Sequence, residues 1–286
     1  MFTTGRAVPI QPRTCRPFVK RHRKLSSDPD KAPDQHSVLT TIEHHRNRER
    51  VKDMGEVFTP EQYVQQMLVL FDEKLWSDEN TVFFEPACGH GNIALAIVER
   101  RINALVKKYV KAGIDQPVLH AVATTIHTIW AVDICPLNVH LTRKRIIDMV
   151  VRRLRTTDFE IRQPELNGYL IHVLCTLIWQ IHENETLSAL SCQDTAQARA
   201  SQTKIGDSWV KANSHKPINF DLNWCEFYER STARNTVPLL YEKTARFLET
   251  SIGGGNTRGF EDFNFARDAV QLLIENHHTQ PTQEAA

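Results

Sequence analysis

The sequence predicts an α/β protein whose parallel sheet is doubly wound, or Rossmann-like, with helices on both faces. Two short apolar segments, 81–84 and 128–134, read as buried strands, and an acidic residue closes each of them. A loop with two glycines follows the first segment, and a helical pattern follows each. Alternating strands and helices favour a parallel sheet, whose ligands bind at the carboxyl ends of the strands.

The first predicted element is a helix over 60–76. Thr59 is its expected N-cap, Pro60 suits the first helical position, and Gln62 would complete a capping box. Apolar residues recur at four-residue spacing, so we expect them on the buried face: Tyr63, Met67, Phe71 and Leu75.

Two longer helices follow the two strands. The first is expected to run for about 20 residues after the loop at 85–92, and its apolar positions are Ala94, Ile97, Val98, Leu105 and Tyr109. Gly113 and Pro117 read as a break before the second strand. Pro136 then opens a helix that reaches roughly to Arg155.

The remainder of the chain is harder to read. Residues 169–181 fit a buried helix or a strand, "KPINFDLNW" at 216–224 is compatible with a strand, and helices are expected at 237–250 and 263–276 around a glycine hinge at 253–256. We divide the chain into a disordered basic tail at 1–36, a cofactor-binding core at 37–190 and a C-terminal region at 191–286.

The composition argues against a disordered or fibrous protein. The chain has 286 residues, 41% hydrophobic residues and a net charge of +1, which is typical of a soluble globular protein. Six cysteines without a C-x-x-C pair favour a reduced compartment, so we expect a cytoplasmic protein, or one encoded by a virus or acting in an organelle. No membrane segment and no metal site are expected. The basic tail is read as a solvated extension, a phosphate-binding arm or a targeting signal.

The stretch "VFFEPACGHGN" carries the strongest functional signal. Gly89 and Gly91 let the backbone turn tightly and approach a ligand closely. Glu85 at the first strand end would suit a cationic or amino-bearing ligand, and Asp133 at the second is placed to hold a ribose diol. Two acids at adjacent strand ends fit S-adenosylmethionine.

Three segments carry a resemblance to a known family. "GEVFTPEQYVQQML", "EPACGHGN" and "WAVDICPLNV" resemble, in order and spacing, the N-terminal half of S-adenosylmethionine-dependent DNA adenine-N6 methyltransferases of the restriction-modification type. The resemblance implies a class I methyltransferase fold, S-adenosyl-L-methionine as cofactor and DNA as partner, with a separate specificity subunit as a further candidate partner. It covers roughly residues 50–150.

The resemblance also implies roles for individual residues. Glu85 would bind the methionine amino group and Asp133 the ribose hydroxyls, while Ile134 and Pro136 would flank the adenine ring. No role is assigned to His90. The remaining residues implied in cofactor binding belong to the F-T-P element and the glycine loop: Phe58, Thr59, Pro60, Pro86, Ala87, Cys88, Gly89, Gly91 and Asn92.

The family's catalytic tetrapeptide, [N/D/S]-P-P-[Y/F/W], is missing. No P-P dipeptide occurs in the chain, and the nearest fragment is "NFDLNW", which makes Asn223 and Trp224 weak catalytic candidates. A core tryptophan is the competing interpretation of Trp224. The predicted function is methyl transfer to DNA adenine. The alternatives are an inactive cofactor- or DNA-binding relative, and a methyltransferase acting on RNA or protein.

Three further features have both a functional and a structural interpretation. One of Glu183, Asn184 and Glu185 could lie near the cofactor adenine. The mixture of lysines with Trp209 at 203–217 suits nucleic acid but is also common in solvated loops. Basic residues of the helix from 136 could contact DNA phosphates or simply complement the helix dipole: Arg143, Lys144, Arg145, Arg152, Arg153 and Arg155.

Overall fold

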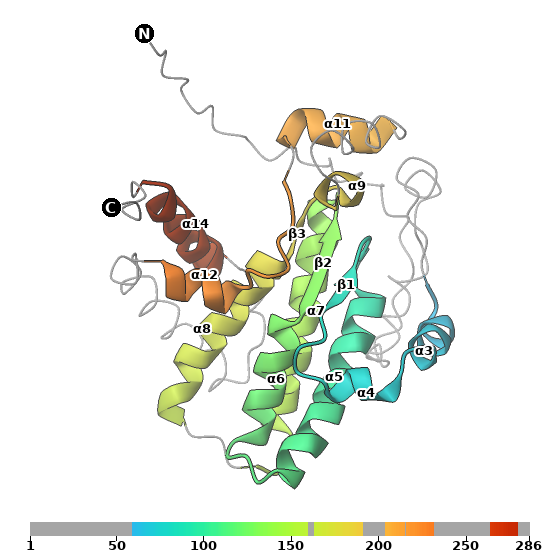
Figure 1. The fold of residues 1–286 in the computed structure, drawn as a ribbon, viewed down its shortest axis with the longest axis vertical. Coiled ribbons are helices and arrows are strands. Elements are labelled where there is room, and N and C mark those ends of the chain that lie inside the picture. The colour runs from blue at the N-terminus through green and yellow to red at the C-terminus, as the bar shows by residue number, and fades with distance from the viewer. Residues whose placement is uncertain (1–58, 160–162, 191–203, 215, 232–263, 280–286) are drawn as a thin grey trace, which may run out of the picture. The chain divides into compact units, whose positions relative to one another are not determined.

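The computed structural model describes residues 59–159, 163–190, 204–214, 216–231 and 264–279. These residues form a mixed α/β structure in which a small three-stranded sheet is surrounded by helices (Figure 1). The predicted tail at 1–36, the helix predicted at 237–250, the glycine hinge and Phe58 all lie outside the described residues.

The sheet is parallel, as predicted, and its strand order is β1-β2-β3. The strands are β1 (Phe83–Glu85), β2 (Ile129–Asp133) and β3 (Ile181–Glu183). Phe84 pairs with Trp130, and Asp133 pairs with Glu183. Because alternate residues of a strand point to opposite faces, this register fixes which side chains share a face.

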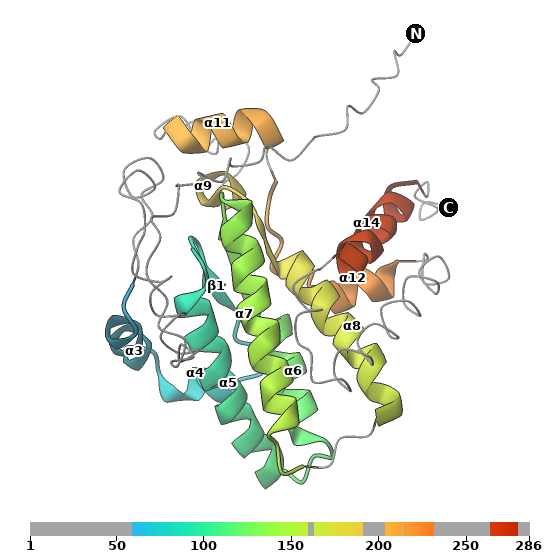
Figure 2. The same ribbon diagram turned by 180° about the vertical axis from the view of Figure 1, so that it is seen from behind.

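The two longest helices confirm the sequence prediction. Helix α5 spans Asn92–Lys111 and helix α7 spans Pro136–Arg155. They pack against each other and lie on one side of the sheet, behind it in Figure 1 and in front of it in Figure 2. All five apolar positions predicted for α5 are buried: Ala94, Ile97, Val98, Leu105 and Tyr109.

The helix predicted at 60–76 is two helices, and its predicted buried face is wrong. Helix α3 spans Glu61–Val69 and buries Val64 and Leu68, whereas Tyr63, Met67 and Phe71 are 51%, 45% and 43% exposed. The chain turns after α3, and Asp72 caps α4 (Glu73–Ser77) by accepting a hydrogen bond from the Lys74 amide. After this turn the buried face of α4 is no longer in line with that of α3. One four-residue spacing over 60–76 therefore could not identify the buried residues of both helices.

Two helices run directly into strands. Helix α6 (Pro117–His127) precedes β2, and α8 (Gln163–Gln180) precedes β3. The segment that fitted either a helix or a strand therefore contains the end of α8 and the start of β3. Helix α6 was not predicted, because Gly113 and Pro117 read as a break; Pro117 instead starts the helix at its first position.

The remaining described elements are helical. They are α9 (Thr186–Ala189), α11 (Lys204–Asn213), α12 (Trp224–Arg230) and α14 (Asn264–Thr279). The final helix was predicted, whereas the strand considered at 216–224 was not found. Helices α12 and α14 pack on α8 (Figure 1), so Trp224 and Leu273 belong to the same core as the sheet.

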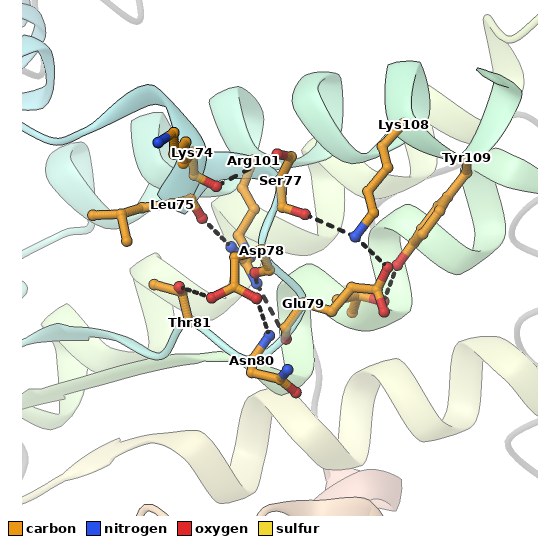
Figure 3. Close-up of polar contacts among 11 residues, drawn as sticks. Lys74, Leu75, Ser77, Asp78, Glu79, Asn80, Thr81, Arg101, Lys108 and Tyr109 are labelled. Carbon is orange, nitrogen blue, oxygen red and sulfur yellow. Dashed lines mark hydrogen bonds and ion pairs between the residues drawn. The ribbon is translucent and has the colours of Figure 1, made fainter. Parts of the chain in front are cut away.

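A fully buried arginine joins the start of β1 to helix α5. The Arg101 guanidinium donates to the carbonyls of Leu75 and Asp78 at 2.9 and 2.6 Å (Figure 3). It also lies 5.2 Å from the centroid of the Phe83 ring. Burial lowers the pKa of Arg101 to about 10. The Arg101 guanidinium thus ties the end of α4 and the turn before β1 to helix α5.

None of the helices in the described ranges has both the length and the apolar character that crossing a membrane requires.

Candidate functional site

Acidic side chains meet at the carboxyl end of the sheet, on one face. Glu85 pairs with Ala131, and Asp133 lies two residues further along β2, so Glu85 and Asp133 share a face. Glu183 pairs with Asp133 and belongs to the same face. The strand-end acids that the sequence singled out are therefore brought to one edge of the sheet.

Asp133 is the anchor of the glycine loop. Its Oδ2 accepts a hydrogen bond from the Gly89 amide at 2.9 Å, and its Oδ1 accepts from the Cys135 amide at 2.8 Å and from Asn138 Nδ2 at 3.3 Å. These contacts hold the loop after β1 and the start of α7 on one carboxylate. The contacts make Asp133→Ala a poor probe of ligand binding, because that change would also release the loop.

The two loop glycines serve different purposes. Both have positive φ, 51° at Gly89 and 90° at Gly91. A Cβ added at Gly91 would meet Thr142 Oγ1 of α7 at 2.8 Å, whereas a Cβ at Gly89 would meet nothing within 4 Å. Gly91 therefore allows α5 and α7 to pack, while Gly89 faces open space in which a ligand can approach the backbone.

This difference predicts opposite effects for two matched substitutions. Gly91→Ala combines a strained φ with a steric clash, and we expect it to destabilise the fold by about 2–4 kcal/mol. Gly89→Ala has room for its methyl group and should cost only about 1–2 kcal/mol, yet that methyl group would occupy the ligand side of the loop. Thermal unfolding and ligand titration of both variants would separate the two roles; equal stability losses would contradict the assignment.

Glu85 is an acid without a cationic partner. Burial raises the pKa of its carboxyl group, and only the backbone amide of Ala87 opposes the shift. Among the described residues, no cation forms an ion pair with it. A carboxylate held in this way favours a positively charged ligand group, which would supply the missing counter-charge.

Thr59, the first described residue of the F-T-P element, contacts the end of the glycine loop. Asn92 is the first residue of α5, and its Nδ2 donates to the Thr59 carbonyl at 3.1 Å. Asn92 Oδ1 accepts from Arg145 Nη1 of α7 at 2.7 Å. Both ends of the Asn92 amide are thus bound by protein, which gives Asn92 a structural role; its contact with the cofactor stays a prediction.

Helix α3 begins without the predicted capping box. Pro60, rather than Thr59, occupies the N-cap position, and no side chain caps the helix. The Thr59 carbonyl instead accepts the hydrogen bond from Asn92, which joins two motifs that are 33 positions apart. Sequence reasoning identified both motifs but not the side chain that joins them.

The other predicted cofactor residues differ in exposure. Cys88 is buried between the strand ends, and burial raises the pKa of its thiol to about 12, so it is a neutral packing group. Pro86, Ala87 and Pro136 are exposed, and Ile134 is half-buried. These four residues therefore remain able to contact a ligand.

The end of β3 is closed by helix α11. Trp209 Nε1 donates to Glu183 Oε1 at 2.9 Å, and Lys216 Nζ lies 5.5 Å from the centroid of the Trp209 ring. Trp209 is 7% exposed. It is therefore not the exposed stacking surface that the lysine-rich segment suggested. Of the three acidic or amide candidates, Glu183 is the one placed beside Asp133 in the sheet.

Asn184 and Glu185 are buried structural residues. Asn184 Nδ2 donates to the Lys216 carbonyl at 2.9 Å, while Glu185 caps α9 by accepting from the Ser188 amide at 2.8 Å. Both side chains are thus already bound within the protein.

The two weak catalytic candidates are also structural. Asn223 caps α12 by accepting from the Glu226 amide at 3.1 Å. Trp224 is 1% exposed, and its Nε1 donates to His172 Nδ1 at 3.3 Å. Trp224 is thus a core residue, as the competing interpretation had it, although it lies on a helix rather than a strand.

Two of the basic residues of α7 have structural contacts. Arg143 donates to the carbonyls of Ile181 and Ile178 at 2.7 and 3.0 Å, and burial lowers its pKa to about 10. Arg145 contacts the glycine loop, as described above. Arg152 and Arg155, at the end of the helix, are exposed. The expected phosphate contacts therefore do not apply to Arg143 or Arg145.

A described hollow lies away from this site, between α4 and α5, and its lining includes Trp76, Glu73 and Arg100. Its lining contains none of the strand-end or loop residues. No protein-family model matches the chain, and neither a curated protein nor a solved structure matches it.

Proposed function

We propose that the carboxyl end of this sheet binds S-adenosylmethionine and that the protein belongs to the class I methyltransferase type. The observation that carries the proposal is convergence. Thr59, the glycine loop and the two strand-end acids come from separate parts of the chain. Hydrogen bonds join Thr59 to Asn92 and Gly89 to Asp133, and the strand register puts Glu85 and Asp133 on one face of the sheet. The carboxyl end of the strands is where ligands bind in open α/β sheets.

The strand order supports the same proposal. Reading from β3 to β1 gives 3-2-1, which is the first half of the doubly wound order 3-2-1-4-5-6. In that arrangement the ligand binds at the end of the first strand, and the glycine loop directly follows β1.

The residues present fit the cofactor chemically. Glu85 offers a poorly solvated carboxylate to the methionine amino group, and a Cβ added at Gly89 meets nothing within 4 Å, which leaves room beside the loop. Asp133, which holds the Gly89 amide, is the residue that would face the ribose hydroxyls. Bound there, S-adenosylmethionine would supply an electrophilic methyl group. The protein would contribute position and electrostatics: Glu85 and Asp133 orient the two ends, and the loop amides approach between them.

DNA adenine is the acceptor we propose, through an N6 amine, and DNA and a specificity subunit are the proposed partners. The proposal rests on the motif resemblance. A second candidate is a non-catalytic cofactor-binding relative, because the chain has no P-P dipeptide, Asn223 caps a helix and Trp224 is buried. These observations bear on the acceptor site and leave the cofactor site unaffected.

A label-transfer assay separates the two candidates. The chain would be incubated with cofactor tritiated on the methyl group and with duplex DNA, RNA or a protein mixture. We expect label in N6-methyladenine of the DNA. The Gly89→Ala variant, which should lose the cofactor but remain folded, is the matched negative control. Cofactor binding without transfer to any acceptor would favour the non-catalytic relative.

A further inference from the structure

A chain of hydrogen bonds links helix α7 to the F-T-P element through the glycine loop. Arg145 Nη1 donates to the His90 carbonyl at 2.8 Å and to Asn92 Oδ1 at 2.7 Å. Asn92 Nδ2 in turn donates to the Thr59 carbonyl at 3.1 Å. Three segments separated by more than 30 positions each are therefore joined by two side chains.

Arg145 determines which way the Asn92 amide points. An amide has one oxygen acceptor and one nitrogen donor, and a guanidinium can only donate, so Arg145 must face the oxygen of Asn92. The nitrogen of Asn92 then points at Thr59, whose carbonyl can only accept. The two contacts therefore select the same orientation of the amide, and loss of Arg145 would leave the Thr59 carbonyl as the one hydrogen-bond partner, among the described residues, that holds the Asn92 side chain in place.

Arg145 also fixes the loop itself. Its Nη1 lies 3.1 Å from His90 Nδ1, so it contacts the side chain as well as the backbone of this loop residue. Beside it, Thr142 Oγ1 donates to the Gly89 carbonyl at 3.0 Å. One turn of α7 therefore holds the side of the loop that faces away from the proposed ligand.

We propose that Arg145 is a positioning residue: through Asn92 it latches the Thr59–Pro60 segment onto the glycine loop, and it thereby controls how long a ligand stays bound. Its effect on ligand retention rests on the proposed function, whereas the latch itself does not. The Thr59–Pro60 segment is held by the hydrogen bond from Asn92, the first residue of α5, to the Thr59 carbonyl. Loss of this bond would free the segment from the loop without disturbing the sheet.

Three variants test the latch. Arg145→Ala removes both connections, and Asn92→Asp is nearly isosteric and keeps an acceptor for Arg145 but cannot donate to Thr59. An acidic residue in the first turn of α5 is compatible with the helix dipole, so Asn92→Asp should fold normally. Arg152→Ala, on the exposed end of the same helix, is the matched control for loss of a cation.

Hydrogen exchange in the absence of any ligand gives the first readout. In Arg145→Ala, amides in 61–68 and in 86–96 should exchange about tenfold faster, the loss expected for one or two net hydrogen bonds. In Asn92→Asp only the 61–68 segment should accelerate. If Arg145→Ala exchanges like Arg152→Ala, or if Asn92→Asp leaves 61–68 as protected as in the wild type, the latch does not exist.

Ligand dissociation gives the second readout. Stopped-flow measurement with S-adenosylmethionine should show faster dissociation in Arg145→Ala and Asn92→Asp by about tenfold, with Arg145→Lys partly restoring the slow rate. Faster exchange in the variants together with no binding by the wild type would refute the proposed cofactor and leave the latch standing. Normal dissociation despite faster exchange would overturn the link to retention.

Discussion

Replacing Arg101 with methionine is expected to destabilise the protein by about 3 kcal/mol, since each buried carbonyl that loses its donor costs roughly 1–3 kcal/mol. The variant keeps most of the aliphatic side chain but leaves the Leu75 and Asp78 carbonyls without their donor, at distances of 2.9 and 2.6 Å in the wild type. Arg101 Nε also donates to Thr128 Oγ1, next to β2, at 3.1 Å. The change therefore affects the entry to two strands.

The neighbouring arginine provides the control. Arg100 forms an ion pair with Glu73, whose side chain is 78% exposed, and it lies over the Trp76 ring. Surface pairs of this kind contribute about 1 kcal/mol or less, so Arg100→Met should be mild. Urea unfolding followed by tryptophan fluorescence would measure both. If both variants lost the same free energy of unfolding, the buried hydrogen bonds of Arg101 would not stabilise the fold more than a surface ion pair does.

Replacing Glu85 with glutamine is expected to weaken S-adenosylmethionine binding by about 10- to 100-fold, the value of a hydrogen bond to a charged group in a partly buried site. The same change should raise the melting temperature. Burial raises the pKa of Glu85, so the charged carboxylate costs folding free energy at neutral pH, and a neutral amide removes that cost. A residue that costs stability yet improves binding is expected at a functional site.

The ligand offers its own control for Glu85. 5′-Methylthioadenosine lacks the amino-acid end, so its affinity should be nearly the same for the wild type and for Glu85→Gln. An equal loss of affinity for both ligands would show that Glu85 does not contact the methionine end.

The pH dependence follows from the same group. A raised pKa means that the folded state holds the Glu85 proton more tightly than the unfolded state, so stability falls as pH rises between the two pKa values and is constant above both. A cationic ligand binds the deprotonated form. Its affinity should therefore fall as the pH drops through the raised pKa of Glu85, and Glu85→Gln should lose that dependence in calorimetric titrations.

Apolar spacing and proline positions predicted the two long helices α5 and α7. The helix Pro136–Arg155 has the predicted limits because a proline sets its start, and α5 shows the predicted buried stripe. The prediction failed at Asp72, where a cap restarts the helix in a new phase, and at Pro117, where a helix start was read as a break. Both residue types begin helices as well as end them, and the sequence alone does not distinguish the two uses.

The site was predictable where it depends on residue type and strand position. Glu85 and Asp133 share a face because Glu85 pairs with Ala131 and Asp133 lies two residues further along β2. The contacts of Asp133 with the loop amides and of Arg145 with Asn92 were not predictable, since they depend on how α7 packs against the loop. Arginines counted as surface charge proved to be internal donors to backbone carbonyls, a use that composition cannot reveal.

Calorimetric titration of the full chain with S-adenosylmethionine tests the central claim most directly. The account predicts saturable binding at one site per chain, which Gly89→Ala abolishes while the variant remains folded. NAD should not bind in the same experiment, because the strand-end acids disfavour a pyrophosphate. Absence of heat with the folded wild-type protein, or undiminished binding by Gly89→Ala, would contradict the assignment of this sheet edge as the cofactor site.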